Sequence, residues 1–398
     1  MNQKGKRIII SVIVVAIIGA IGVGVYVGLQ RATLTISEGG QKNNSVLPIT
    51  SSGYQGGGGA TQENDITEKD LLEFYENQKK RLSIVSDKNI VGYWFSKQSP
   101  TSTPILWYAT KNVDIFSGTG TSTHQVVLSL ANQTAQSVIG ALGKPYAVIT
   151  LENGQKVLFD GVKKTWEWLS PDVISVAFSP DGTQIALLSK TSASEKTIYI
   201  RQSPAGSKKP TPITTLAIQD VNIIWGAKDV ITLAPRSSYK TEASIVQFNI
   251  KNKTASVLDS GNGIQVIWDT NGTRAMLFKS NNGRSMQVRI IDTIGTSIVD
   301  AAFSTIKEKC AFGENALVWC AIPYAASKEG TVMWPDDINK RATYTKDTVV
   351  RLDVEKKSVD TILDSGETML DVYAIQHVGN NLYFINRYDD RLYQYSLE

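Results

Sequence analysis

The sequence predicts an all-β chain, a β-propeller that follows an N-terminal transmembrane helix. Two observations predict the propeller: beyond residue 82 the chain consists of short runs rich in Val, Ile, Trp, Tyr and Phe, and these runs repeat. The membrane helix is predicted by an uncharged apolar stretch near the N-terminus. The 398 residues are 42% apolar and 20% charged, which suits a large packed domain.

The predicted membrane segment runs from Ile8 to Leu29, 22 residues without a charge. A helix of that length spans roughly 30 Å of hydrocarbon. Residues 1–7 carry three basic side chains and no acid, so this stub is expected in the cytoplasm and the rest of the chain outside. A cleaved signal peptide is the alternative, although the apolar run continues past its small residues. We therefore expect a single-pass protein of the cell membrane, in contact with the lipid bilayer through this helix.

Two segments separate the anchor from the repeats. Residues 30–64 are rich in Gly and Ser, with four consecutive glycines at 56–59, and this composition predicts a flexible tether. Residues 65–82 place apolar side chains among Glu and Lys at helical spacing, which predicts one amphipathic helix.

The propeller prediction, residues 83–398, depends on five copies of one pattern, in which an apolar strand, a polar turn and a second apolar strand follow each other. The copies are ISVAFSPDGTQIALL from Ile174, VNIIWGAKDVITL from Val221, IQVIWDTNGTRAMLF from Ile264, KEKCAFGENALVWC from Lys307 and DVYAIQHVGNNLYFI from Asp371. Their anchor residues are Phe178, Trp225, Trp268, Phe312 and Ile375, at spacings of 47, 43, 44 and 63 residues, and weaker copies lie near Phe95 and Gly140. A period in the forties is typical of propeller blades. Seven anchors predict seven blades; six blades and a two-sheet sandwich are the alternatives.

The last copy has only three predicted strands before the sequence ends. Leu82–Ser86 is an unpaired predicted strand just before the first blade. Pairing this strand with the last copy would close the ring and remove two exposed edges.

The segment Phe178–Leu187, FSPDGTQIAL, closely resembles the repeat of TolB-type, WD-repeat-like bacterial propellers. The layout, with its Cys310…Trp319-Cys320 segment, also resembles membrane-anchored propellers of candidate-phyla bacteria. The resemblance implies a ring-shaped binding or scaffolding module at the cell envelope, a family for which no catalytic residues are established. The chain departs from TolB in its retained anchor and in lacking the α/β domain expected before the propeller.

Cys310 and Cys320 flank a predicted hairpin turn. In a hairpin with a three-residue loop they lie opposite each other, within the reach of a disulfide, whereas a one-residue slip sends them to different faces. A location outside the cell would permit oxidation. A disulfide and a pair of buried free thiols both remain open.

The long spacing before the last anchor comes from an insertion, Pro323 to Thr348, in the sixth blade. It contains Trp334, Asp336 and Asp337, which we interpret as a candidate binding loop because loops that depart from a repeat often carry function. A solvated acidic loop is the alternative.

The remaining sequence excludes several activities. It contains no nucleophile elbow, P-loop, HExxH motif or calcium loop, so no catalytic, cofactor-binding or metal-binding residue is assigned. Three of the four net positive charges lie in the stub, which leaves 38 basic against 37 acidic residues and no support for a nucleic-acid partner. We expect a non-catalytic module, not an enzyme, that binds an envelope protein or glycan. The alternative is a carbohydrate-active lyase or glycosidase at the cell surface.

Overall fold

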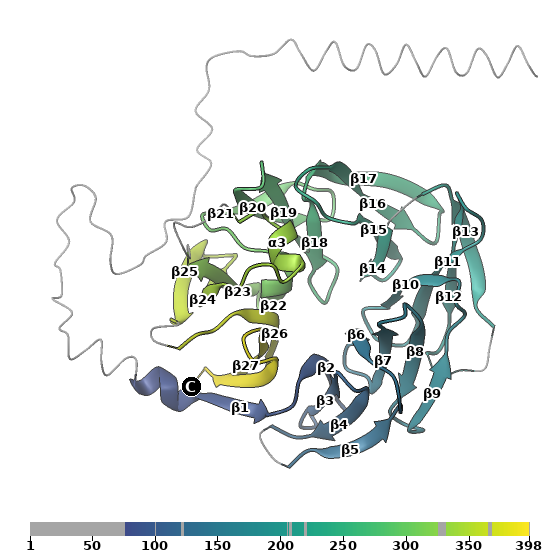
Figure 1. Cartoon of the computed structure of the whole chain (residues 1–398). Coiled ribbons are helices and arrows are strands. Elements are labelled where there is room, and N and C mark those ends of the chain that lie inside the picture. The colour runs from purple at the N-terminus through teal and green to yellow at the C-terminus, as the bar shows by residue number, and fades with distance from the viewer. Residues whose placement is uncertain are drawn as a thin grey trace, which may run out of the picture. The chain divides into compact units, whose positions relative to one another are not determined.

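Seven sheets surround a central axis in the computed structural model (Figure 1). The structure describes residues 76–397, apart from residue 100 and segments 121–122, 205, 207–208, 219–220, 325–331 and 365–367. Within these residues every sheet has four antiparallel strands, so the fold is the predicted all-β propeller with seven blades. The six-bladed and sandwich alternatives are wrong.

The blades follow each other along the chain, and the strands of each blade are ordered from the innermost outward. Blades 1 to 3 are β2 (Ile90–Ser96), β3 (Ile105–Thr110), β4 (Asp114–Gly118) and β5 (Gln125–Ser129); β6 (Ala135–Gly140), β7 (Tyr146–Leu151), β8 (Lys156–Asp160) and β9 (Thr165–Trp168); and β10 (Val173–Phe178), β11 (Ile185–Lys190), β12 (Lys196–Arg201) and β13 (Thr211–Leu216). Blades 4 and 5 are β14 (Val221–Ala227), β15 (Val230–Pro235), β16 (Glu242–Asn249) and β17 (Thr254–Asn262); and β18 (Gln265–Trp268), β19 (Arg274–Asn281), β20 (Ser285–Asp292) and β21 (Ser297–Ala301). Blade 6 is β22 (Cys310–Phe312), β23 (Leu317–Tyr324), β24 (Lys346–Asp353) and β25 (Ser358–Leu363), and blade 7 is β26 (Val372–Val378), β27 (Asn381–Asn386), β28 (Arg391–Ser396) and β1 (Leu82–Ser86).

Burial explains why the repeats keep an apolar first hairpin. First strands of neighbouring blades contact each other at several junctions, such as β2 with β6 and β10 with β14, and the second strands are largely buried. β11, for example, buries its first four residues, whereas the outer strand β13 is exposed or half-buried throughout. All seven anchor residues of the repeat lie on first strands. The sequence repeat therefore reflects the first strands of the blades, which lie nearest the axis and pack most closely.

The ring closes as the sequence predicts. β1 pairs antiparallel with β28, with Leu82 opposite Tyr395 and Ser86 opposite Leu392. A strand from the start of the domain thus completes the last blade. This arrangement leaves no unpaired edge between the two ends of the domain.

The N-terminal predictions fall largely outside the described residues. The predicted span (8–29), the tether (30–64) and the first part of the predicted amphipathic helix lie there, while residues 76–81 are helical. Gln78 in this helix accepts a hydrogen bond from the backbone of Asp364 at 3.2 Å, which attaches the helix to blade 6. Within the part of the chain that the structure describes, no helix is long and apolar enough to cross a membrane.

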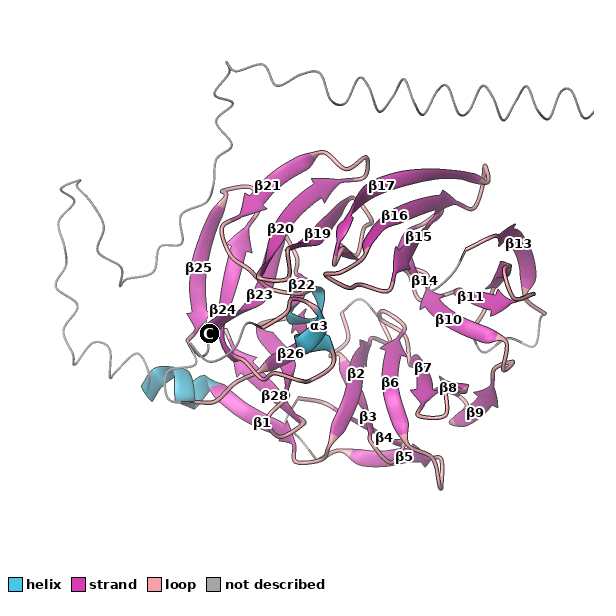
Figure 2. Ribbon diagram, turned by 45° about the horizontal axis from the view of Figure 1, so that its top comes forward, coloured by secondary structure: helices cyan, strands magenta, loops and turns pink. Residues whose placement is uncertain are grey.

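One face of the ring, which we call the upper face, carries the loops from each second strand to the third and the loops that lead into each first strand. The longest loop on this face is the blade 6 insertion between β23 and β24, described from residue 332 onward. It contains the short helix α3 (Asp336–Asn339). Figures 1 and 2 both show α3 close to β22, at the inner side of the blades.

Candidate functional site

Two tyrosines are stacked on the upper face where blades 6 and 7 meet. Tyr344 lies in the insertion just before β24, and Tyr388 lies in the turn between β27 and β28. Their ring centroids are 5.4 Å apart, with 22° between the ring planes. Tyr344 is 43% exposed and Tyr388 is 40% exposed. This tyrosine pair is therefore a fixed aromatic surface open to solvent.

Arg387 supports the tyrosine pair from within the protein. Its guanidinium carbon lies 5.3 Å from the centroid of the Tyr344 ring, and Nη2 donates a hydrogen bond to the carbonyl of Thr343 at 3.3 Å. The residue is only 2% exposed. A desolvated cation over an aromatic ring contributes about 2 kcal/mol. Within the described residues, Nε of Arg387 has no hydrogen-bond partner, while Nη1 lies 3.8 Å from Oδ2 of Asp371.

Lys309, Asp347, Asp371 and Arg387 form a buried group that we call the ion cluster. The side chains of Lys309 and both aspartates have no exposed surface. Nζ of Lys309 donates to Oδ1 of Asp371 at 2.7 Å and to Oδ2 of Asp347. Removal of any one charge would leave another charge unpaired in the protein interior. We therefore expect loss of any member of the ion cluster to be destabilising.

Strand ends position the ion cluster. Lys309 ends the 3-10 turn η1 (Lys307–Lys309) directly before β22, and Asp371 directly precedes β26, so both stand at the entrance to a first strand in neighbouring blades. Backbone donors complete the arrangement, from Thr345 to Asp371 at 3.0 Å and from Val372 to Asp347 at 2.7 Å. The ion cluster therefore joins blade 6 to blade 7.

The surroundings of Asp347 and Tyr388 shift the pKa of both side chains upward. Burial raises the pKa of Asp347, and the nearby Lys309 opposes that effect. Burial also raises the pKa of Tyr388, with a further contribution from the negative charges of Asp371 and Asp347. The phenol of Tyr388 thus stays a neutral hydrogen-bonding group at physiological pH.

The predicted binding loop lies next to this site, but its three named side chains contact the protein itself. The carboxylate of Asp336 accepts bonds from the Ser238 hydroxyl at 3.0 Å and the Tyr239 backbone at 2.8 Å, both in blade 4. Asp337 accepts the backbone N–H of Met333 at 2.9 Å. Trp334 is half-buried against the core shared by blades 5 and 6. In the structure, these residues fix the insertion across three blades.

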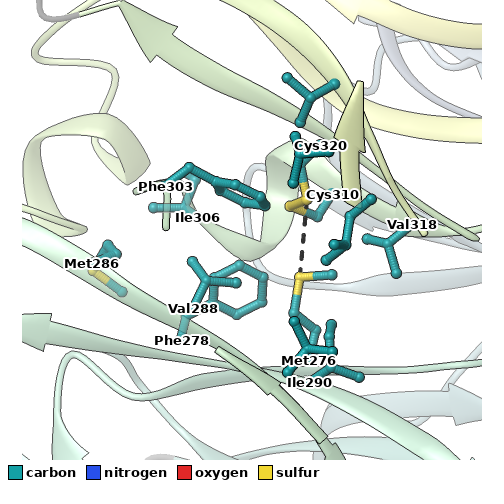
Figure 3. Packing of buried hydrophobic residues seen from close by; sticks show 14 of the residues in the cluster. Met276, Phe278, Met286, Val288, Ile290, Phe303, Ile306, Cys310, Val318 and Cys320 are labelled. Carbon is teal, nitrogen blue, oxygen red and sulfur yellow. Dashed lines mark hydrogen bonds between the residues drawn. A yellow bond between two sulfur atoms is a disulfide. The ribbon is translucent and has the colours of Figure 1, made fainter. Parts of the chain in front are cut away.

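Cys310 and Cys320 are register partners on β22 and β23, and the structure joins them in a disulfide. Both are buried in an apolar cluster with Phe278, Ile306 and Val318 (Figure 3). Sγ of Cys320 lies 4.0 Å from Sδ of Met276. The bond therefore stabilises the hairpin whose first strand begins beside Lys309.

A cavity with a volume of about 530 Å³ lies on the face opposite the tyrosine pair, between blades 3 and 4. The turn of the segment Phe178–Leu187, which resembles the TolB-type repeat, lines part of this cavity. Three isoleucines contribute apolar lining, Ile200, Ile213 and Ile250. Asp181, which lines it, accepts hydrogen bonds from the hydroxyls of Ser179 and Thr183 at 2.6 and 2.8 Å. The carboxylate of Asp181 at this cavity therefore already accepts hydrogen bonds from residues of its own turn.

The two histidines lie away from the tyrosine pair. The Tyr108 hydroxyl lies 3.3 Å from Nδ1 of His124, and His377 stacks on Trp319 at 5.2 Å between ring centroids. Burial lowers the pKa of both. Among the described residues no group of three or more His, Cys, Asp or Glu side chains is placed to hold a metal ion.

The sequence analysis missed both the ion cluster and the tyrosine pair. A signal was present: Lys309 and Asp371 are opposite charges directly before the first strands of successive repeats. The repeat is defined by the apolar anchors within those strands, and it does not require a charge at the entrance to a strand. Tyr344 and Tyr388 carry no spacing signal, because one belongs to an insertion and the other to a short turn.

The comparisons with known proteins show the fold. No protein-family model matches the chain, and no curated protein matches it. A solved mitotic checkpoint complex contains a chain similar to this one at 10% identity and TM-score 0.54, covering 80% of this chain and 95% of that one. An oligogalacturonate lyase in complex with manganese is similar at 7% identity and TM-score 0.57, over 80% and 93%. The oligogalacturonate lyase of Vibrio parahaemolyticus is similar at 6% identity and TM-score 0.53, over 77% and 97%.

These comparisons correct the expectation that the chain is not an enzyme. Two of the structures that share its fold are named as lyases, so an enzyme can be built on a propeller of this architecture. The missing sequence motifs therefore do not exclude catalysis. At 6% and 7% identity the likeness establishes the propeller alone.

Proposed function

We propose that this chain is a membrane-anchored propeller that binds a glycan outside the cell through the tyrosine pair. The observation that carries the proposal is the stacking of Tyr344 on Tyr388, held open to solvent by a cation and a buried ion cluster. The C–H bonds of a sugar ring are attracted to the electron-rich face of an aromatic ring. Because the rings are fixed before binding, little conformational entropy is lost when a sugar contacts them.

The size of the exposed apolar surface favours a glycan over a protein partner. Besides the tyrosine pair, Met369 is the exposed large apolar side chain of the connection between blades 6 and 7 in the described residues. A stable protein interface usually buries about 800 Å² on each partner around several anchors. Three exposed side chains fall short of that area, whereas they suffice to contact one or two sugar residues. The lyases that share the fold are named for an oligosaccharide, which gives a precedent for glycan recognition on a propeller.

The N-terminal sequence supports the location outside the cell. The uncharged run from Ile8 to Leu29 would anchor the chain, and the basic stub before it would remain in the cytoplasm. The Gly-rich tether at 30–64 would hold the propeller away from the bilayer. The resemblance of Phe178–Leu187 to TolB-type repeats supports a role at a bacterial envelope.

The proposal is tested with the full-length chain in a zwitterionic detergent that has no sugar headgroup. A panel of envelope and plant oligosaccharides is titrated by calorimetry against the wild type, Tyr388→Ala and Trp168→Ala. Trp168 is the matched control, because it is 49% exposed on the outer strand β9, away from the tyrosine pair. We expect Tyr388→Ala to weaken binding by about tenfold or more and Trp168→Ala to leave it unchanged.

Two results would count against the proposal. If no oligosaccharide binds, or if Trp168→Ala weakens binding as much as Tyr388→Ala, the tyrosine pair is not the site. Turnover of the same oligosaccharides is measured alongside, because the fold is shared with lyases.

A further inference from the structure

Charges around the tyrosine pair cancel within the chain. Residues 336–347 contain three cations and three acids, and residues 387–391 contain two of each. Lys309 and Asp371 add one charge of each sign. The segments that carry the tyrosine pair and the ion cluster therefore contain six positive and six negative side chains, which sum to no net charge.

Four of these six cations are paired or buried. Arg341 forms an ion pair with Asp390 at 2.9 Å, and Lys340 lies 3.9 Å from Asp336. Lys309 is enclosed between two aspartates, and Arg387 is 2% exposed with its guanidinium beside the Tyr344 ring. No one of these four cations is both exposed and unpaired.

From this balance, and resting on the proposed glycan-binding function, we infer that the tyrosine pair selects uncharged sugar residues over uronates. A uronate carboxylate placed on the pair would lose hydration without gaining an unpaired partner among these four cations, and loss of a charged group's hydration without compensation is costly. A neutral sugar needs only aromatic contact and hydroxyl partners, and the rings and hydroxyl groups of the pair supply both.

The charge preference distinguishes this site from a generic polysaccharide-binding surface with exposed arginines. Such a surface binds acidic chains through long-range attraction, which salt screens. Binding by contact with a neutral aromatic surface changes little with salt. Salt dependence and charge preference should therefore vary together.

The test uses two forms of one ligand, an oligogalacturonate of defined length and its fully methyl-esterified form. The two have the same linkages and differ in charge at each C6. Their affinities for the full-length chain are measured by calorimetry at low and high salt. We expect the ester to bind about tenfold more tightly than the acid, with less than a twofold change between the two salt concentrations.

A variant extends the test. Asp390→Asn removes the acid that pairs with Arg341 and keeps a residue type that tolerates the positive φ of 53° at this position. The freed arginine should narrow the preference for the ester by several-fold. Tyr388→Ala should weaken both ligands together, because it removes the shared aromatic surface.

The outcomes separate the two proposals. Tighter binding of the acid, or affinity that falls steeply with salt, overturns the inference and leaves glycan binding intact. An unchanged ester preference in Asp390→Asn also counts against it. Binding of neither ligand, nor of any other oligosaccharide, overturns the proposed function and the inference with it.

Discussion

The junction between blades 6 and 7 and the junction between blades 3 and 4 solve the same packing problem with different side chains. Blades 3 and 4 meet through a cluster of Ala, Ile, Leu, Trp and Phe side chains that includes Leu188, Ile198 and Trp225. Blades 6 and 7 also share an apolar cluster, but its upper end contains the buried ion cluster. The core of the first junction is therefore built mainly of apolar side chains, whereas the second carries the desolvation cost of buried charge.

The difference teaches where the repeat stops determining the structure. Apolar packing tolerates many sequences, because hydrophobic side chains of suitable volume can replace each other. A buried ion cluster has one arrangement in which each charge is compensated. That single arrangement would suit the proposed binding surface, because Arg387 of the ion cluster lies beside the Tyr344 ring of the tyrosine pair. The cavity at the other junction, of about 530 Å³, has no comparable support.

The largest effect is expected from Lys309→Met. This substitution removes the cation and leaves Asp347 and Asp371 facing each other in a dry interior, so unfolding free energy should fall by about 3–5 kcal/mol. Urea unfolding followed by circular dichroism measures the change. Adding Asp347→Asn and Asp371→Asn should recover part of the loss, because the uncompensated charges are gone.

Lys228→Met is the control for that prediction. Lys228 is exposed in the turn before β15, so its replacement should change stability by less than about 0.5 kcal/mol. Equal losses in Lys309→Met and Lys228→Met would show that the ion cluster does not hold the junction.

The apolar junction is tested by Leu188→Ala. Leu188 has no exposed surface, and its truncation leaves a cavity, which should cost about 3 kcal/mol. Leu188→Met keeps the volume and should cost about 1 kcal/mol. Glycan affinity at a temperature where Leu188→Ala remains folded should equal that of the wild type. A loss of affinity there would mean that the two junctions are not independent.

The Cys310–Cys320 bond should have a smaller effect on the charged junction. It closes a loop with a sequence separation of 10, and removal of such a cross-link costs about 2–3 kcal/mol. A reductant should lower the urea midpoint of the wild type. The double variant Cys310→Ala/Cys320→Ala should start from the lower midpoint and not respond. Thiol labelling shows whether the reductant has broken the disulfide. If both cysteines are labelled and the urea midpoint of the wild type is unchanged, this expectation is contradicted.

A fall in pH should change the contributions of Asp181 and Asp347 to folding stability in opposite directions. Hydrogen bonds from Ser179, and then Thr183, lower the pKa of Asp181 at the edge of the blade 3–4 cavity. Its stabilisation is therefore present above the ordinary pKa of aspartate, about 3.9, and is lost as pH falls through the lower folded pKa. Burial raises the pKa of Asp347, so its contribution is instead greatest at low pH and is lost as pH rises through the folded pKa.

Asp181→Asn isolates this smallest effect. Stability measured between about pH 5 and pH 3 should fall less steeply in the variant than in the wild type, because the titrating group has been removed. Parallel stability curves would contradict the hydrogen-bonded carboxylate at this turn.

Much of the fold could be predicted because it depends on residues that repeat. The seven anchors, from Phe95 to Ile375, all lie on first strands, and Leu82–Ser86 completes the last blade. The opposed positions of Cys310 and Cys320 also followed from the turn length. Such features depend on local period and register, which a single sequence displays.

The candidate site could not be predicted in the same way. Lys309 ends the turn η1, Asp347 lies on β24 and Asp371 precedes β26, and only the ring brings these three residues together. The predicted binding loop illustrates the limit, since the carboxylate of Asp336 contacts blade 4 across about a hundred residues of sequence. Long-range contacts of single residues leave no periodic trace.

Hydrogen–deuterium exchange of the full-length chain, with and without a saturating neutral oligosaccharide, tests the central claim most directly. The account predicts slower exchange in residues 341–345 and 387–391, which carry the tyrosine pair, and no change at 179–184 or 228–229 beside the blade 3–4 cavity. Slower exchange at the cavity, with the tyrosine pair unaffected, would contradict it.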